Sequence, residues 1–252
     1  MFANHFKNKV AVVSGCGGGM GLAVAQMLAD SACQVYGLDK KPAPRFNTNT
    51  DQGIQYFQGD LTDPEFVSSV MEQVQQQCNQ LDYLVNTAGV LWFDRDRSFV
   101  DMNLQDWDEI MTINLKSVVH TGRAALPLMQ ANGGGAMVHF SSIQCLRGDN
   151  HPQDAYQASK AAIIALSKSI AIQFAGDGIR SNVILPGPCH TPMQQRWDAD
   201  NTALRNLSSQ IPLGRVGQAQ DMANACCFLL SDLASFITGT ELIVDGGIMA
   251  KP

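Results

Sequence analysis

A glycine-rich segment between two apolar runs is the feature that most constrains how this chain can fold. Residues 14–21 read Ser-Gly-Cys-Gly-Gly-Gly-Met-Gly and follow the β-branched run 10–13. Residues 20–31 then carry apolar side chains at helical spacing, and residues 33–38 form a second apolar run that ends at Asp39. A strand, a glycine turn, a helix and a strand make one βαβ unit. A glycine loop in that context can hold a pyrophosphate at the helix N-terminus.

Strands and helices continue to alternate along the rest of the chain. The pattern predicts helices over 64–77, 104–129, 155–175 and 221–230, and strands over 55–58, 83–86, 136–140, 181–185 and 241–244. Such alternation favours a parallel sheet covered by helices on both faces. We therefore expect an α/β fold, with a single Rossmann-type doubly wound sheet in one dinucleotide-binding and catalytic domain over residues 1–252.

One long segment breaks this pattern. Residues 186–213 are polar, contain four prolines and show helical spacing only around 198–209. A stretch of this length between regular elements is usually a functional loop or a disordered one. We expect it to be a substrate lid.

Composition excludes several classes of protein. The net charge is −6, and no basic run is longer than Lys40-Lys41, which argues against nucleic acid and membrane partners. The start of the chain has no leader pattern, and no apolar run approaches the roughly 20 residues of a spanning helix, so we expect a cytoplasmic protein. The seven Cys lack zinc spacing, which predicts reduced thiols and no metal.

Asp39 lies about twenty residues beyond the glycine loop, where a carboxylate can bind the adenosine ribose hydroxyls. A ribose 2′-phosphate would be repelled there, so NAD is the expected cofactor and NADP is disfavoured. Lys40, Lys41 and Arg45 lie nearby and weaken this charge argument. A capping role for Asp39 is the structural alternative.

Tyr156 and Lys160 occupy positions i and i+4 of a predicted helix and therefore share one face. A lysine ammonium beside a phenol favours the phenolate, which would let tyrosine act as a general acid or base. Taken alone, this spacing is more often an incidental pair on a helix surface.

In combination, these motifs resemble the short-chain dehydrogenase/reductase family over nearly the whole chain. The further matching segments are DLTD at 60–63, NTAG at 86–89, IN at 113–114, SS at 141–142, YQASK at 156–160, PG at 186–187 and ITGTELIVDGG at 237–247. The resemblance implies that Tyr156 exchanges a proton with the substrate and that Lys160 holds the nicotinamide ribose. It implies that Ser142 binds the substrate oxygen and that Asn114 supports a water relay. Ser141 is the alternative to Ser142.

The resemblance also implies which residues contact the cofactor. They are Gly15, Gly19, Met20 and Gly21 in the loop, Asp39, Asp60 and Leu61 at the adenosine, and Asn86, Ala88, Gly89, Tyr156, Lys160, Pro186, Gly187 and Thr191 beyond it. Ser14 and Thr87 depart from the commoner residues, and an insertion at 92–98 is expected at the rim of the active site.

Residues near these motifs predict the substrate pocket. The expected substrate contacts are Ser142, Gln144, Trp92, His151, Tyr156 and Cys189. The pocket wall is expected to include also Leu91, Phe93, Cys145, Arg147, Pro188, His190, Met193 and Trp197. This amphipathic mixture suits a cyclic diol, polyol or hydroxy ketone.

The expected function is NAD-dependent oxidation of a secondary alcohol to its ketone, or the reverse. An NADPH-dependent reductase of 3-oxoacyl groups is one alternative. A dinucleotide-binding regulatory protein without catalysis is another. We also expect a homotetramer built partly from the helices over 104–129 and 155–175 and from the C-terminal segment.

Overall fold

The computed structural model describes residues 5–46, 53–193 and 201–251. Its central sheet has seven parallel strands in the order β3-β2-β1-β4-β5-β6-β9. The strands are β1 (Val10–Ser14), β2 (Gln34–Asp39), β3 (Ile54–Gln58), β4 (Tyr83–Asn86), β5 (Gly135–Phe140), β6 (Ile179–Pro186) and β9 (Glu241–Val244).

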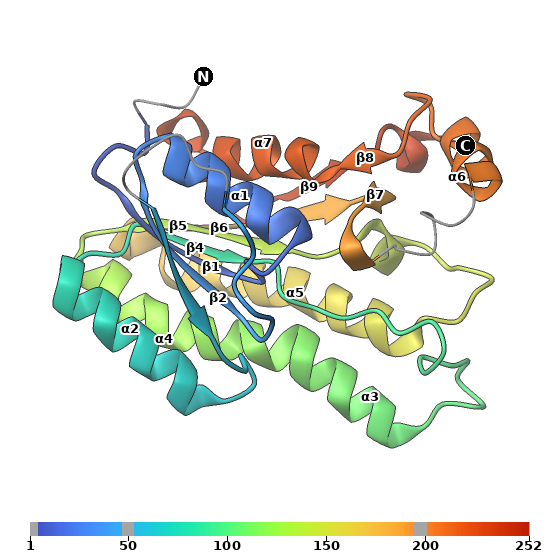
Figure 1. Ribbon diagram of the computed structural model, residues 1–252, viewed down its shortest axis with the longest axis horizontal. Helices are drawn as coiled ribbons and strands as arrows, with labels where there is room; N and C mark the ends of the chain where they lie inside the picture. The colour runs from blue at the N-terminus through green and yellow to red at the C-terminus, as the bar shows by residue number, and fades with distance from the viewer. Residues whose placement is uncertain (1–4, 47–52, 194–200, 252) are drawn as a thin grey trace.

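Helices cover both faces of this sheet (Figure 1). One face packs against α1 (Gly19–Asp30) and α7 (Ala219–Leu230), and the other against α2 (Pro64–Cys78), α4 (Ser117–Ala131) and α5 (Asp154–Gln173). The side chains alternate accordingly, since Val138 of β5 belongs to the first core and Met137 to the second. The predicted doubly wound α/β fold is confirmed.

The order of the strands determines where a ligand can bind. Strands β1 and β4 are neighbours, with Ser14 beside Asn86, and the strand order reverses between them. The helices that follow such strands leave the sheet in opposite directions, which opens a crevice at the carboxyl ends of the strands. The glycine loop and the segment after Asn86 both enter this crevice.

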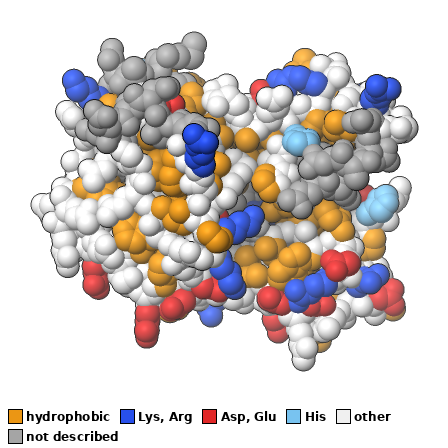
Figure 2. Space-filling view, viewed as in Figure 1, with side chains coloured by type: hydrophobic (Ala, Val, Ile, Leu, Met, Phe, Trp, Pro, Cys, Tyr) orange, Lys and Arg blue, Asp and Glu red, His pale blue; other side chains and the backbone are white. Residues whose placement is uncertain are grey.

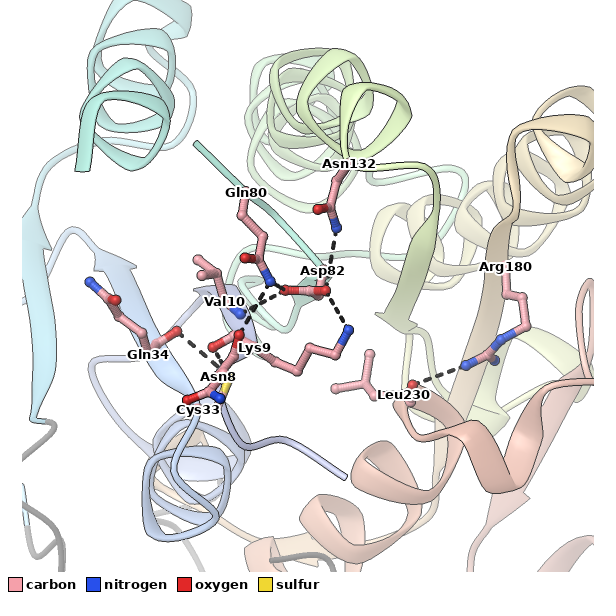
Figure 3. A network of polar contacts seen from close by, with 10 residues as sticks. All are labelled: Asn8, Lys9, Val10, Cys33, Gln34, Gln80, Asp82, Asn132, Arg180 and Leu230. Atoms are coloured by element: carbon pink, nitrogen blue, oxygen red, sulfur yellow. Dashed lines mark hydrogen bonds and ion pairs between the residues drawn. The ribbon is translucent and has the colours of Figure 1, made fainter. Parts of the chain in front are cut away.

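The amino ends of the strands are held together by a buried carboxylate (Figure 3). Asp82 accepts hydrogen bonds from the Lys9 ammonium and from the backbone N–H of Val10, each at 2.9 Å. Nearby, the Arg180 guanidinium donates to the backbone carbonyl of Leu230 at 3.0 Å, where α7 ends. These contacts stabilise the end of the sheet opposite the crevice.

The predicted helix over 104–129 is interrupted. The chain forms α3 (Leu104–Met111), a π-helical turn η1 (Thr112–Lys116) and then α4. Asn114 lies in this turn, and its carboxamide pairs with Val90, accepting from the backbone N–H at 2.7 Å and donating to the carbonyl at 3.0 Å. A π turn inserts one residue into a helix, and here it places Asn114 against the segment after β4.

Several shorter elements complete the chain. Two-residue strands β7 (Cys189–His190) and β8 (Gly217–Gln218) pair beside the crevice and were not expected from the sequence. Helix α6 (Asn201–Gln210) matches the helical spacing around 198–209, although residues 194–200, including Trp197, lie outside the described residues. The single-turn elements are η2 (Ile143–Leu146), η3 (Ala175–Asp177), η5 (Asp232–Ala234) and η6 (Ile248–Ala250).

Within the part of the chain that the structure describes, every helix is too short or too polar to cross a bilayer.

Candidate active site

A cleft of about 1540 Å³ lies at the carboxyl ends of the strands. A small-molecule pocket usually measures about 300–1,000 Å³, so this cleft has room for a dinucleotide and a substrate together. Figure 2 shows hydrophobic and basic side chains side by side in the middle of this face. The predicted residues that line the cleft are Gly15, Gly19, Met20, Gly21, Asp39, Asp60, Leu61, Ala88, Gly89, Trp92, Ser142, Gln144, His151, Tyr156, Lys160, Pro186, Gly187, Cys189 and Thr191.

The glycine loop is shaped so that its backbone forms the floor of the cleft. Gly15 has φ +79°, in the region that favours glycine, and a Cβ on Gly21 would lie 2.2 Å from the Gly15 carbonyl oxygen. The N-cap of α1, Gly18, provides no side-chain cap, and the first turn of α1 carries no acidic residue. The positive end of this helix therefore faces the cleft without an acidic residue in its own first turn to neutralise it.

A carboxylate lies beside this loop at the end of β2. Asp39 accepts hydrogen bonds from the backbone N–H groups of Gly17 and Lys41, each at 2.9 Å. Lys40 forms an ion pair with Asp60 at 2.9 Å, so the ammonium nearest to Asp39 in sequence is turned toward another acid. Both interactions leave negative charge at the end of the cleft where an adenosine ribose would lie.

The chain after β6 covers the glycine loop from the opposite side. A Cβ built on Gly19 would lie 3.4 Å from the Thr191 side chain, and one on Gly18 would lie 3.7 Å from Pro192. The start of the predicted lid, residues 186–193, therefore forms a wall of the cleft.

Three polar side chains meet at the inner end of the cleft. Tyr156 lies in the first turn of α5, and its side chain is hydrogen-bonded to that of Ser142, which follows β5. Lys160 lies one turn further along α5, with its Nζ 5.8 Å from the centroid of the Tyr156 ring. This Nζ donates a hydrogen bond to the Phe140 carbonyl at 3.0 Å. All three side chains are buried.

The two adjacent serines have different partners. Ser141 donates its Oγ hydrogen to the Lys160 carbonyl oxygen at 2.8 Å, which ties the end of β5 to α5. Both serines line the cleft, but the side chain that interacts with Tyr156 is that of Ser142. Successive residues of an extended backbone point to opposite sides, so the strand direction of β5 places Ser142, not Ser141, beside the tyrosine.

Comparison with known proteins agrees with this geometry. A family model described as enoyl-(acyl carrier protein) reductase matches residues 15–249. The chain is 34% identical over 252 residues to the 3-oxoacyl-[acyl-carrier-protein] reductase FabG of Escherichia coli K12, covering 97% of this chain and 98% of the relative. It is 33% identical over 251 residues to cis-4-hydroxycyclohexanecarboxylate dehydrogenase of Sinomonas cyclohexanicum, covering 97% and 98%.

A solved structure is similar over the same length. The solved structure of a putative short-chain dehydrogenase/reductase from Burkholderia xenovorans superposes with a TM-score of 0.88 at 30% identity, covering 98% of each chain. This chain belongs to the short-chain dehydrogenase/reductase family. It is an oxidoreductase of that type, and the family uses the nicotinamide dinucleotides NAD or NADP.

The cleft of this family member suits such a cofactor. The glycine floor lets a cofactor approach the backbone closely. The N-terminus of α1 provides an anion site, and the Asp39 carboxylate provides an acceptor for ribose hydroxyls. The described residues contain no cluster of three His, Cys, Asp or Glu side chains that could hold a metal ion.

Burial controls the electrostatics of the site. It lowers the pKa of the Lys160 ammonium to about 8. It raises the pKa of the Tyr156 phenol above its usual value, against the opposite effect of the hydrogen bond from Ser142. The sequence had suggested that Lys160 lowers the pKa of Tyr156. In the protein by itself desolvation outweighs that effect, because the ammonium is held by the Phe140 carbonyl, away from the phenol.

Two of the predicted catalytic and cofactor-binding residues lie outside the lining of the cleft, as do Cys145 and His190 of the predicted pocket wall. Asn86 is buried, and its carboxamide oxygen accepts from Ser14 and Thr121 at 3.0 and 2.8 Å. Asn114 is fully buried, and besides Val90 it donates to the Ser159 hydroxyl at 3.1 Å. Their side chains are engaged within the protein, so they position the cleft wall and do not point into the cleft.

The predicted substrate contacts differ in how far their side chains are exposed and in which residues hold them. Gln144 donates from Nε2 to Asp149 at 2.6 Å, while its buried Oε1 has no partner among the residues that the structure describes. The His151 side chain is 88% exposed at the mouth of the cleft. Burial raises the pKa of the Cys189 thiol to about 12, which keeps this sulfur protonated. The Trp92 ring packs under the Arg95 guanidinium at 3.9 Å.

Sequence reasoning missed part of the cleft wall. Gln153, three residues before Tyr156, is buried and lines the cleft. Ile248, Met249 and Lys251 from the C-terminal segment also line the cleft. The position of Gln153, in the same helical turn as Tyr156, is the sequence feature that could have placed it in the cleft wall. The C-terminal residues are not marked by a motif, and they approach because Asp245 accepts hydrogen bonds from the backbone N–H groups of Gly247 and Met249, each at 2.7 Å.

Proposed function

We propose that this protein is an NAD-dependent dehydrogenase that interconverts a secondary alcohol, in a cyclic diol, polyol or hydroxy ketone, and its ketone. The observation that carries the proposal is the buried group of Ser142, Tyr156 and Lys160 at the inner end of a dinucleotide-sized cleft. A hydroxyl pair beside an ammonium is suited to moving one proton to or from a substrate oxygen.

Each residue has a distinct part in this reaction. When bound, the nicotinamide cofactor supplies the hydride acceptor or donor. Ser142 donates a hydrogen bond to the substrate oxygen. The phenolate of Tyr156 takes the proton of the alcohol during oxidation, and the Tyr156 hydroxyl so formed returns it during reduction. Lys160 holds the nicotinamide ribose, and its ammonium, 5.8 Å from the centroid of the Tyr156 ring, favours the phenolate against the opposing effect of burial. Asn114 supports a water relay to Lys160 and holds Val90 in the cleft wall.

The charge at the adenosine end supports NAD over NADP. The Asp39 carboxylate is fixed by Gly17 and Lys41, and an added phosphate dianion would lie within a few ångströms of it. At an effective dielectric of about 20 this repulsion amounts to several kcal/mol. Lys41 provides a partial offset, so we propose a preference for NAD and not complete exclusion of NADP.

A second candidate is an NADPH-dependent reductase of 3-oxoacyl groups. It is favoured by the 34% identity to a 3-oxoacyl-[acyl-carrier-protein] reductase. The similarity to a dehydrogenase of a hydroxycyclohexane carboxylate favours the first candidate. A regulatory protein without catalysis is disfavoured, because Asn114, Ser142, Tyr156 and Lys160 are all present.

The test is a screen of diols, sugars, hydroxy acids, steroids and 3-oxoacyl thioesters with both dinucleotides, following the absorbance of the reduced nicotinamide. Tyr156→Phe is the control variant. It removes the proton-exchanging hydroxyl, so we expect turnover to fall by about 10²–10⁴-fold while dinucleotide binding persists. A Tyr156→Phe rate above about a tenth of the wild-type rate contradicts the role of Tyr156. Faster turnover of 3-oxoacyl thioesters with NADPH than of any alcohol with NAD supports the second candidate.

We further propose that residues 1–252 act as one catalytic domain in the cytoplasm and that residues 186–213 close over the substrate. Thr191 and Pro192, which lie beside Gly18 and Gly19 of the glycine loop, support the latter.

A further inference from the structure

The helix that carries Tyr156 begins in an unusual way. Gln153 is the N-cap residue of α5, yet its side chain makes no capping hydrogen bond. An N-cap side chain ordinarily accepts from the second or third N–H of its helix. Here the N–H groups of Ala155 and Tyr156 donate to the two carboxylate oxygens of Asp96, at 3.0 and 2.9 Å. The cap therefore comes from segment 92–98, which leaves the Gln153 side chain available for another partner.

Gln153 lies in the wall of the cleft. Gln153 is 5% exposed and lines the cleft, and its side chain forms no hydrogen bond with any residue that the structure describes. A carboxamide has two N–H donors and a carbonyl acceptor. A ligand that enters the cleft and excludes water must supply hydrogen-bonding groups to this carboxamide, because a polar group left unpaired in a dry site costs free energy. A polar side chain held in this way is typical of a binding contact.

The position of Gln153 in its helix determines which part of a ligand it can reach. Tyr156 is three residues further on, and side chains at i and i+3 have Cβ atoms about 5–6 Å apart. The same proximity lets an N-cap side chain and the third helical residue interact in a capping box. Because Ser142 and Tyr156 bind the reacting oxygen, a group bound by Gln153 belongs to a neighbouring part of the substrate.

We propose that Gln153 is a specificity-determining residue whose carboxamide hydrogen-bonds an oxygen on the substrate carbon next to the one that is oxidised. This inference rests on the proposed dehydrogenase function and narrows its substrates to vicinal diols and α-hydroxy ketones. A site that binds a substrate hydroxyl rejects the analogue without it, because its own polar group is then left unpaired. An isolated secondary alcohol is therefore a poor substrate.

The test compares substrates that differ by one vicinal oxygen. The kcat/KM values for cis-1,2-cyclohexanediol and cyclohexanol, and for 2,3-butanediol and 2-butanol, are measured with NAD in wild type and Gln153→Leu. Leucine keeps most of the side-chain volume and removes the carboxamide. We expect the variant to lose about 10- to 100-fold on each diol and to stay within about threefold on each mono-alcohol, so that the preference for diols collapses.

Further variants separate recognition from folding. Gln153→Asn keeps the carboxamide but withdraws it by one methylene, and we expect it to lose the same preference. Gln157→Leu is the matched control, because Gln157 lies one turn further along α5, is half-buried and does not line the cleft. NADH fluorescence titration reports the cofactor site, and we expect the Kd to be unchanged in all three variants.

Three results would overturn the inference. An unchanged ratio of diol to mono-alcohol in Gln153→Leu shows that the carboxamide does not select the substrate. An equal loss on both members of each pair assigns Gln153 a structural role. A wild-type enzyme that oxidises mono-alcohols as well as diols also excludes the selectivity. If the wild type oxidises no alcohol and reduces no ketone with either dinucleotide, the proposed function itself is wrong.

Discussion

The carboxylate of Asp96 accepts a 2.9 Å hydrogen bond from the backbone N–H of Tyr156, which lies 60 residues later in the chain. Asp96 is 3% exposed, so this contact is sealed from water. In the same segment, Arg95 donates to Asp106 of α3 at 2.7 Å. The rim segment 92–98 therefore joins α3 to α5 and determines where the first turn of α5, with Tyr156, begins.

Replacing Asp96 with alanine leaves two buried N–H groups unpaired. An unsatisfied buried donor and a lost cap each cost about 1–3 kcal/mol, so we expect Asp96→Ala to lower the free energy of unfolding by about 2–4 kcal/mol. Because Tyr156 loses its backbone anchor, we also expect kcat to fall about tenfold while the Kd for the dinucleotide changes little. Urea unfolding, steady-state kinetics and NADH titration measure these effects.

Asp94 provides a matched control in the same segment. It is exposed and forms no contact that resembles a cap, so Asp94→Ala should behave as wild type. Asp96→Asn retains one acceptor oxygen and should fall between wild type and Asp96→Ala in both stability and kcat. A wild-type unfolding midpoint and kcat in Asp96→Ala would refute the anchoring role.

Asp39 is expected to select NAD over NADP by roughly ten- to a thousandfold in kcat/KM, which corresponds to about 1.4–4 kcal/mol. Asp39→Ala should raise the relative use of NADP. It should also weaken NAD use, since the variant no longer holds the Gly17 N–H. Asp39→Asn removes the charge but keeps an acceptor for that N–H, which separates the two effects. Equal kcat/KM values for both dinucleotides in the wild type would show that Asp39 does not discriminate.

Stability should depend on pH through His139. This side chain is fully buried on β5, with Nδ1 3.1 Å from the Asn86 amide nitrogen and Nε2 unpaired, and burial lowers its pKa to about 4. In the unfolded chain a histidine has a pKa near 6.5. Between these values the unfolded state binds the additional proton, so stability is complete above about pH 6.5 and falls as the pH decreases toward 4.

The expected loss over this interval is about 3 kcal/mol. His139→Gln keeps an acceptor for Asn86 and does not titrate, so its urea unfolding midpoint should vary less between pH 6.5 and 4.5. His151→Gln is the comparison variant, because that side chain is 88% exposed. The same pH dependence in wild type and His139→Gln would assign the effect to other groups.

A homotetramer remains our prediction for the assembly. Large apolar side chains are exposed on the single chain, among them Phe99, Val100, Leu104, Ile172 and Phe236. Multi-angle light scattering should give about four times the chain mass of 27.2 kDa. Ile172→Glu, on the predicted α5 interface, should shift the mass downward. A wild-type mass near that of one chain at micromolar concentration would refute the prediction.

Local patterns were sufficient for most of the fold. The β-branched run 10–13, the glycines that follow it and the helical spacing of 20–31 appear as β1, the loop and α1, because backbone propensity and apolar periodicity act over a few residues. The spacing of Tyr156 and Lys160 likewise follows from the helix alone. The sequence therefore determined the elements, their order and the side chains that one element carries together.

Contacts between distant segments decided the rest. Local spacing does not show that Ser142 contacts Tyr156 while Ser141 binds the Lys160 carbonyl, or that a π turn places Asn114 against Val90. It also does not show that Asp96 caps α5 and releases Gln153 into the cleft. Each outcome depends on which buried donor or acceptor finds a partner after the sheet and helices have packed. Tertiary structure alone determines that pairing, because an unpaired polar group is costly only where packing excludes water.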